Sequence, residues 1–212
     1  MELKIIYFNF PFWRAEVARI PLYISNTKFE DKRITSEEFS YIKENGKMTD
    51  GTIIPFSQLP VLVIDGQSIA QTGAIARICG KISGFYPDSL VEAGKVDQII
   101  DTATDINMLM RPSMREQDPD KKKLMRQELS KNDLPKYFGF LENLLKDEKI
   151  WFAENRMTIA DIAIWRLMGW LKSGVIDDIP KDITDGFNKL NTVYNEVNNN
   201  TDIKRWVSET YK

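Results

Sequence analysis

Few residues of this chain are of types that act in catalysis, and the residue types that are absent exclude several classes of active site. The 212 residues include no histidine and one cysteine, Cys79. Ser-His-Asp and Cys-His catalysis, histidine metal sites, Cys-x-x-Cys redox pairs and intrachain disulfides are therefore excluded. What remains near the start is a phenol, Tyr7, at the end of an apolar run, and a guanidinium, Arg14, where the next segment begins. A phenol can donate a hydrogen bond to an anion, and a guanidinium adds positive charge.

A second candidate site lies at the pair Gln71-Thr72, just before a predicted helix. The N-terminus of a helix attracts carboxylates through its free N–H groups and its dipole. Thr72 suits this place as an N-cap residue, and its hydroxyl could also bind a carboxylate. Capping alone would explain this residue too, and the two roles are compatible.

The first half of the chain contains the elements that would position these residues. Apolar residues on both sides of Asp65-Gly66 are typical of a β-hairpin with a tight turn. The expected elements are a strand at 3–8, a helix at 14–25 that Pro21 should bend or shorten by a turn, a strand at 29–34, a weak helical turn at 37–43, a loop at 45–58, hairpin strands at 61–64 and 68–70, and a helix at 73–82. This order predicts an α/β domain over residues 1–82.

The second half, residues 88–212, predicts helices alone, after a linker at 84–88. Thr158 and Asp161 form a capping box. The helix that follows is apolar on nearly every side, which is typical of a buried central helix. Further helices are expected at 90–110, 121–129, 136–145, 184–198 and 201–209.

Several short motifs, in their order and spacing, resemble the glutathione transferase family over the whole chain. They are Ile6-Tyr7-Phe8-Asn9, Arg14-Ala15-Glu16, Gln58 to Leu62, Ala70-Gln71-Thr72 with Ala74 to Arg77, Val96-Asp97 with Asp101 and Asp105, and Thr158 to Asp161. The tyrosine type is most similar, and within it the sigma class, which includes glutathione-dependent prostaglandin D synthases. The resemblance implies a thioredoxin-like, glutathione-binding N-terminal domain and an all-helical C-terminal domain.

This resemblance implies that Tyr7 stabilises the thiolate of glutathione and that Arg14 supports it electrostatically. A free thiol has a pKa of about 8.5. Lowering that pKa by two units takes roughly 2.7 kcal/mol, and a hydrogen bond to a charged group supplies about 1.5–3 kcal/mol. Without the resemblance, a tyrosine at the end of a strand would more simply be a core residue.

The resemblance also implies which residues bind the rest of glutathione. Thr72 would hold the γ-glutamyl carboxylate, and Leu59, before a cis-proline, would pair its backbone with the cysteinyl moiety. Phe39 stands where the family has a tryptophan and cannot donate a hydrogen bond. Asp105 would reach the γ-glutamyl amine in the neighbouring subunit of a homodimer. The predicted glutathione-binding residues are Phe39, Lys43, Gln58, Leu59, Pro60, Gln71, Thr72 and Asp105.

Two features depart from the family pattern. The spacing from Tyr7 to Arg14 is one residue longer than usual and is filled by Phe10-Pro11-Phe12-Trp13. These bulky side chains either line the pocket for the electrophile or crowd it. The loop at 44–58 is about eight residues longer than in the sigma class; it either covers the glutathione site or, as we favour, is a surface insertion. The predicted hydrophobic pocket contains Phe10, Phe12, Trp13, Met108, Arg111, Ala163 and Leu167.

The predicted function is that of an enzyme, a glutathione transferase that uses glutathione as co-substrate and conjugates it to small hydrophobic electrophiles without a metal. A glutathione-dependent isomerase and a non-catalytic glutathione- or ligand-binding protein are the alternatives.

The net charge of −2 predicts no nucleic-acid partner. The start of the chain lacks the features of a signal peptide, and the longest apolar stretch contains Asp161 and Arg166, so we expect a cytoplasmic protein with no membrane contact. Cys79 is expected to be a small buried hydrophobe.

Overall fold

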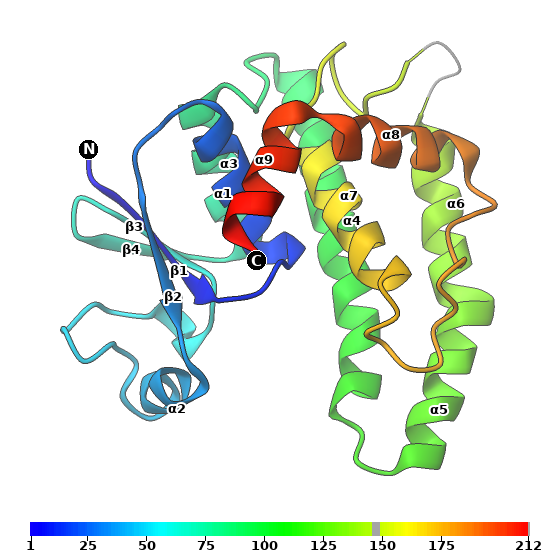
Figure 1. The fold of residues 1–212 in the computed structure, drawn as a ribbon, viewed down its shortest axis with the longest axis horizontal. Coiled ribbons are helices and arrows are strands. Elements are labelled where there is room, and N and C mark those ends of the chain that lie inside the picture. The colour runs from blue at the N-terminus through cyan, green and yellow to red at the C-terminus, as the bar shows by residue number, and fades with distance from the viewer. Residues whose placement is uncertain (146–148, 212) are drawn as a thin grey trace. The chain divides into compact units, whose positions relative to one another are not determined.

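The structure, a computed structural model, describes residues 1–145 and 149–211, which group into two compact units. One unit contains Met1–Tyr86 with Thr201–Lys212, and the other contains Pro87–Asn200. The grouping differs from the predicted bounds 1–82 and 88–212 at the C-terminus, because the last helix, α9 (Thr201–Thr210), packs on α1 (Trp13–Ile24) of the first unit. Figure 1 shows α9 beside α1.

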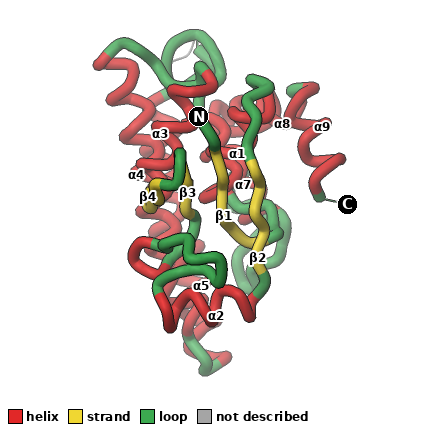
Figure 2. Tube along the Cα trace, turned by 90° about the vertical axis from the view of Figure 1, so that its left-hand side faces the viewer, coloured by secondary structure: helices red, strands yellow, loops and turns green. Residues whose placement is uncertain are grey.

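The first unit contains a four-stranded sheet in the order β2-β1-β3-β4 (Figure 2). β1 (Leu3–Phe8) pairs in parallel with β2 (Glu30–Ile34) and antiparallel with β3 (Val61–Ile64), which forms a hairpin with β4 (Gln67–Ala70). Asp65 and Gly66 both have positive φ, +46° and +80°, as a two-residue hairpin turn of this hand requires. The predicted strands and hairpin are confirmed.

One face of this sheet carries the hydrophobic core of the first unit. Alternation along β1 directs Leu3 and Ile5 to the same face. They pack there with residues of α1 and of α3 (Thr72–Ser83), which include Leu22, Ile75 and Cys79. Cys79 is buried, and burial raises the pKa of its thiol to about 12. Its predicted role as a buried hydrophobe is confirmed.

The second unit contains helices among its described residues, as predicted. They are α4 (Leu90–Arg115), α5 (Pro119–Glu128), a π-helical turn (Leu129–Asp133), α6 (Leu134–Leu144), α7 (Ile159–Lys172) and α8 (Asn188–Asn199). α7 packs against both α4 and α8 and buries most of its residues, which confirms the predicted central helix. Its capping box is also present: Thr158 Oγ1 accepts from the Ala160 N–H, and Asp161 accepts from the Thr158 N–H.

Two helices differ from the prediction. The weak turn expected at 37–43 is a full helix, α2 (Ser36–Asn45), because Thr35 and Glu38 form a second capping box and Gly46 ends the helix in the left-handed conformation. The helix expected from Thr184 begins later, as α8. Thr184 and the two residues after it form turns instead.

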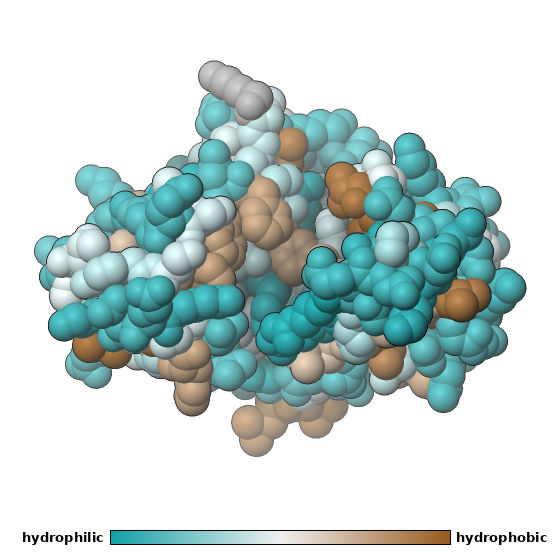
Figure 3. All heavy atoms as spheres, turned by 90° about the horizontal axis from the view of Figure 1, so that it is seen from below, coloured by the Kyte–Doolittle hydropathy of each residue, from teal (hydrophilic) through white to brown (hydrophobic). Residues whose placement is uncertain are grey.

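The surface seen in Figure 3 is mostly hydrophilic, and its hydrophobic residues form separate patches. Single exposed hydrophobic residues are ordinary in proteins. Among the described residues, no helix is both long enough and apolar enough to cross a membrane. No cluster of three or more metal-binding side chains is found within the same residues.

Candidate glutathione site

Tyr7 lies near the carboxyl end of β1, where only 4% of its surface is exposed. Burial raises the pKa of its phenol to about 12, although the positive charges of Arg14 and Arg19 act in the opposite direction. The phenol is therefore protonated at neutral pH. Within the described residues its hydroxyl has no hydrogen-bond partner. Tyr7 can thus donate a hydrogen bond to a bound anion.

Arg14 follows Trp13 in the first turn of α1. Its Nε atom is buried and has no hydrogen-bond partner in the part of the chain that the structure describes. No described carboxylate forms an ion pair with it either. Its charge is felt at Tyr7 and has no counter-ion within the described protein, so the surroundings of the phenol favour an anion.

The bulky side chains of the loop between Tyr7 and Arg14 differ in how deeply they are buried. Trp13 is fully buried and Phe12 nearly so, while Phe10 is 42% exposed. The Phe10 ring lies 5.6 Å from that of Tyr7 and 5.9 Å from that of Phe12, measured between centroids. Phe10 is therefore the member of the loop best placed to contact a second substrate beside Tyr7. That role stays a prediction.

The strand register places Pro60 and Gln71, which flank β3 and β4, at the same ends of these strands as Tyr7 on β1. Ile6 pairs with Val61, and Val61 pairs with Ala70. Tyr7 follows Ile6 on β1, while Gln71 follows Ala70 on β4, two strands away. Neighbouring strands are about 4.8 Å apart, so this row spans roughly 10 Å, the length of about three extended residues. A tripeptide fits such a row better than a small anion does.

The expected cis-proline lies in the middle of this row. The Leu59–Pro60 peptide bond is cis, as the resemblance implied, and it directly precedes β3. Leu59 is nearly buried, while Gln58 before it is exposed. The backbone of Leu59 thus lies between Tyr7 on one side and Gln71 on the other, where an extended peptide could pair with it.

The start of α3 is open to an anion. Gln71 is its N-cap, with φ +75°, and makes no side-chain capping bond. Thr72, expected to be the N-cap, is instead the first helical residue. Its hydroxyl is buried and has no hydrogen-bond partner among the described residues. The free N–H groups of the helix and this hydroxyl together form a site for a carboxylate.

α2 contributes Phe39 and Lys43, one turn apart. The Phe39 ring packs edge-on against the ring of Phe8, at 5.0 Å between centroids. The Lys43 ammonium lies 5.1 Å from the centre of the Phe39 ring. Phe8 directly follows Tyr7, so these contacts attach α2 to the end of β1. Phe39 packs there and offers no hydrogen bond, whereas exposed Lys43 brings a positive charge.

The remaining predicted residues belong to the second unit, and their part in a site stays a prediction. Asp105, Met108 and Arg111 are exposed along α4, where an Arg111 Nη1 atom lies 4.0 Å from the sulfur of Met108. Ala163 and Leu167 of α7 are fully buried.

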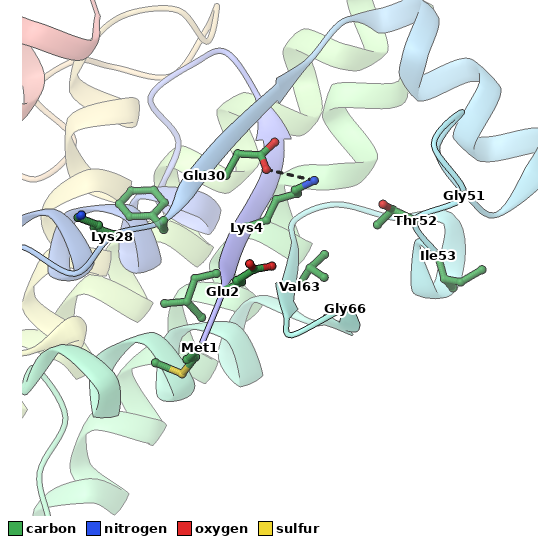
Figure 4. Close-up of a pocket in the computed structure, with 12 residues that line it drawn as sticks. Met1, Glu2, Lys4, Lys28, Glu30, Gly51, Thr52, Ile53, Val63 and Gly66 are labelled. Atoms are coloured by element: carbon green, nitrogen blue, oxygen red, sulfur yellow. Dashed lines mark ion pairs between the residues drawn. The ribbon is translucent and has the colours of Figure 1, made fainter.

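One hollow of the first unit lies elsewhere. It has a volume of about 770 Å³ and contains none of the predicted glutathione-binding residues. Figure 4 shows the Lys4–Glu30 ion pair among the side chains that line it, with Thr52 and Ile53 of the long loop to one side. Its lining residues are Met1, Glu2, Leu3, Lys4, Lys28, Phe29, Glu30, Gly51, Thr52, Ile53, Val63 and Gly66. This part of the loop borders that hollow, and the preference for a surface insertion stays a prediction.

Comparisons with known proteins agree with this geometry. The family description "Glutathione S-transferase, N-terminal domain" matches residues 3–77, and "Glutathione S-transferase, C-terminal domain" matches residues 104–210. The chain belongs to the glutathione S-transferase family. The thioredoxin-like sheet of the first unit and the helical second unit are those of the glutathione transferase fold.

Individual relatives extend over most of the chain. The hematopoietic prostaglandin D synthase of Mus musculus is 32% identical over 182 residues, 84% of this chain and 85% of the relative. The structure of prostaglandin synthase D of Nilaparvata lugens has a TM-score of 0.84 at 28% identity, over 99% of this chain and 98% of that one. The structure of monomeric Na-GST-3, a glutathione S-transferase of Necator americanus, has a TM-score of 0.79 at 27% identity, over 100% and 98%.

One charged residue next to Tyr7 was not predicted. Arg19 lies on the buried face of α1, with its guanidinium carbon 5.8 Å from the centre of the Tyr7 ring. A signal was available in the sequence, since Glu16 and Arg19 are three residues apart and both interrupt an otherwise apolar helix face.

Proposed function

We propose that the protein is a glutathione transferase in which the Tyr7 hydroxyl donates a hydrogen bond to the sulfur of bound glutathione and holds it as a thiolate. The observation that carries this proposal is the state of Tyr7. Its phenol is buried and protonated, has no partner within the described protein, and lies near the uncompensated charge of Arg14. A thiolate is the ligand that such a pair favours.

The same edge of the sheet supports the rest of the tripeptide. In the proposed complex, the γ-glutamyl carboxylate binds the Thr72 hydroxyl and the first N–H groups of α3. The cysteinyl moiety pairs with the backbone of Leu59, and Gln58, Gln71 and Lys43 contact the remaining polar groups. The roughly 10 Å from β1 to β4 suits this extended arrangement.

Ionisation of the thiol near neutral pH is the chemical contribution of the site. A pKa lowered by two units from about 8.5 corresponds to roughly 2.7 kcal/mol. A hydrogen bond from Tyr7 to the thiolate supplies about 1.5–3 kcal/mol, and Arg14 adds to it. The thiolate then forms a C–S bond to a small hydrophobic electrophile. In a substitution, the leaving group departs with the electron pair of the bond that breaks; in an addition, the carbanion formed takes up a proton from solvent. No metal takes part in this proposal.

Tyr7→Phe tests the role of Tyr7. Turnover of a nitroaromatic electrophile should fall by about 10- to 100-fold, while the Kd of glutathione changes by less than about threefold, because the lost bond favours the thiolate over the thiol. Tyr137→Phe is a matched control, since it removes a hydroxyl without a described partner from α6. Unchanged turnover in Tyr7→Phe would contradict the proposal.

A glutathione-dependent isomerase is a second candidate, because a mouse relative is named a prostaglandin D synthase. An isomerase uses the same thiolate and returns it at the end of the cycle. The two activities therefore differ in stoichiometry: a transferase consumes one glutathione per product, and an isomerase consumes none. Binding of glutathione with no turnover of either kind would indicate a glutathione- or ligand-binding protein.

We further propose that the protein is a sigma-class homodimer of the cytoplasm. Similarity to prostaglandin D synthases supports the class, and the position of Asp105 on the exposed face of α4 allows the cross-subunit role that the resemblance implies. One similar structure is described as monomeric, so the molar mass in solution is the test. A dimer whose glutathione affinity falls in Asp105→Asn is the expected result. The single buried cysteine suits a reducing compartment.

A further inference from the structure

The buried face of α1 carries two charged side chains, Glu16 and Arg19, and neither has any exposed surface. Burying a charge is costly unless it is paired and hydrogen-bonded. Neither residue is among those that the resemblance assigns to glutathione. Their contacts explain how the charges are tolerated and connect them to Tyr7.

Arg19 contacts three parts of the first unit. Its Nε and Nη2 atoms both lie 2.8 Å from Asp31 Oδ1 on β2. Its Nη2 atom also donates to the carbonyl of Phe8, the residue after Tyr7, at 3.4 Å. Its guanidinium carbon lies 5.8 Å from the centre of the Tyr7 ring, within the range of a cation–π interaction.

Glu16 is held by the C-terminal segment. Its Oε2 atom accepts from the Trp206 indole N–H at 2.9 Å, and its Oε1 atom accepts from the Tyr211 hydroxyl at 2.5 Å. Oε1 also lies 3.6 Å from Arg19 Nη1, and the Tyr211 oxygen lies 3.4 Å from the same nitrogen. The last residues of the chain therefore complete the surroundings of Arg19.

A second arginine balances the charges. Arg33 pairs with Asp31 Oδ2 at 2.7 Å and donates to the side chain of Asn9. Its guanidinium carbon lies 5.0 Å from the centre of the Tyr211 ring. Two carboxylates, Glu16 and Asp31, thus face two guanidinium groups.

We propose that Arg19 is a positioning residue of the thiolate site, held behind the ring of Tyr7 by Glu16, Asp31 and the C-terminal segment. The inference rests on the proposed function, because it needs a thiolate in front of Tyr7. Arg19 fixes the end of β1 through the Phe8 carbonyl and adds its charge to that of Arg14. Glu16 and Asp31 limit how strongly that charge is felt.

The charge balance gives predictions of opposite sign. Glu16→Gln removes a negative charge beside Arg19 and should lower the pKa of the bound glutathione thiol, by about 0.3–1 unit. Arg19→Gln removes the positive charge and should raise that pKa by a similar amount, while Arg19→Lys should keep it near the wild-type value. A merely structural role would give a rise in every variant, because a displaced Tyr7 no longer favours the thiolate.

The experiment is a titration of bound glutathione, followed by thiolate absorbance, in the full-length variants. Glu209→Gln is the matched control for charge, since Glu209 is exposed on α9 and bonds the Tyr23 hydroxyl. Asp31→Asn is the second acid variant. It removes the second carboxylate that pairs with Arg19, and Asp31 is less buried than Glu16. It should also lower the thiol pKa, so it tests the inference even if Glu16→Gln does not fold.

A lowered thiol pKa in Glu16→Gln or Asp31→Asn, with no change in Glu209→Gln, supports the inference. A raised or unchanged pKa in these acid variants overturns it while leaving the proposed function intact. If glutathione bound to the wild-type protein keeps the pKa of free thiol, the proposed function itself fails, so the two failures are distinguishable.

Discussion

The starts of α7 and α3 each contain a buried threonine, the N-cap Thr158 and the first helical residue Thr72, and they differ in which polar groups are hydrogen-bonded. At the start of α7, Asp161 accepts from the Phe152 N–H at 3.1 Å, the Thr158 N–H at 2.7 Å and the Thr158 hydroxyl at 2.9 Å. At the start of α3, Gln71 makes no capping bond and the Thr72 hydroxyl has no described partner. The first start is closed by its own side chains, and the second is left open.

The difference lies in a buried hydroxyl that is hydrogen-bonded at Thr158 and has no described partner at Thr72. Both threonines are buried, so an unsatisfied hydroxyl at one of them carries a cost of about 1–3 kcal/mol. The backbone of Gln71 also has a positive φ, which residues other than glycine rarely adopt. We interpret the open start of α3 as a binding site for the carboxylate of the proposed ligand.

Asp161→Ala should have the largest effect on stability. It leaves three buried donors without their acceptor, so the free energy of unfolding should fall by about 3–5 kcal/mol. Denaturant unfolding measures this, and the remaining folded protein should bind glutathione with unchanged affinity. A loss below about 1 kcal/mol would show that the start of α7 is not closed in the way described.

The closed start should also give stability a pH dependence. Burial raises the pKa of Asp161 from 3.8 to about 6, against the opposing hydrogen bonds of Thr158 and Phe152. Because its pKa is higher in the folded than in the unfolded state, the protonated carboxyl stabilises the folded protein at pH values below the unfolded-state pKa. That contribution is lost as the pH rises through the folded-state pKa. The unfolding free energy from this group should fall by about 2 kcal/mol between pH 4 and pH 6. Asp161→Asn should lack this slope; an identical slope in that variant would exclude Asp161 as its source.

The two threonines provide a matched pair. Thr158→Val should lower the unfolding free energy by about 1–2 kcal/mol through the lost cap and leave glutathione binding unchanged. Thr72→Val should leave stability unchanged or raise it, because the hydroxyl has no described partner, and should weaken glutathione binding about 10- to 100-fold. Calorimetric titration and denaturant unfolding measure both quantities. Equal stability losses in the two variants would break the comparison.

Gln71→Gly should have the smallest effect. Glycine adopts a positive φ without strain, so the unfolding free energy should rise by about 1 kcal/mol. Glutathione should bind more weakly, because the side chain of Gln71 is lost. A lower melting temperature in this variant than in the wild type would show that the backbone of Gln71 is not strained.

Local signals predicted the parts of the fold that depend on neighbouring residues. The hairpin turn at Asp65-Gly66 and the capping box of Thr158 are fixed within four residues, and both are present. Thr35 and Glu38 form the same kind of capping box, yet only a weak helical turn was predicted where the structure has the full helix α2. The place of Thr72 as first helical residue depends on the φ of Gln71, which no propensity indicates.

The surroundings of the candidate site depend on distant residues and could not be predicted. Glu16 meets Trp206 and Tyr211, which are 190 and 195 positions away along the chain. From the sequence, the spacing of Glu16 and Arg19 indicates at most a local pair on one helix. It gave no sign that the C-terminal helix would bond one of them or that Tyr7 would lie against the other. Tyr7 itself was identified by family resemblance, since a strand-end tyrosine alone predicts only a core residue.

We propose that the ends of β1, β3 and β4 form a site that holds glutathione as a thiolate at Tyr7. The most direct measurement is the ultraviolet difference absorbance of bound glutathione against pH, in the wild-type protein and in Tyr7→Phe. We predict a bound-thiol pKa about two units below 8.5 in the wild type, with a clear rise in Tyr7→Phe. Glutathione that binds with the same thiol pKa in both proteins, equal to that of free thiol, would contradict the claim.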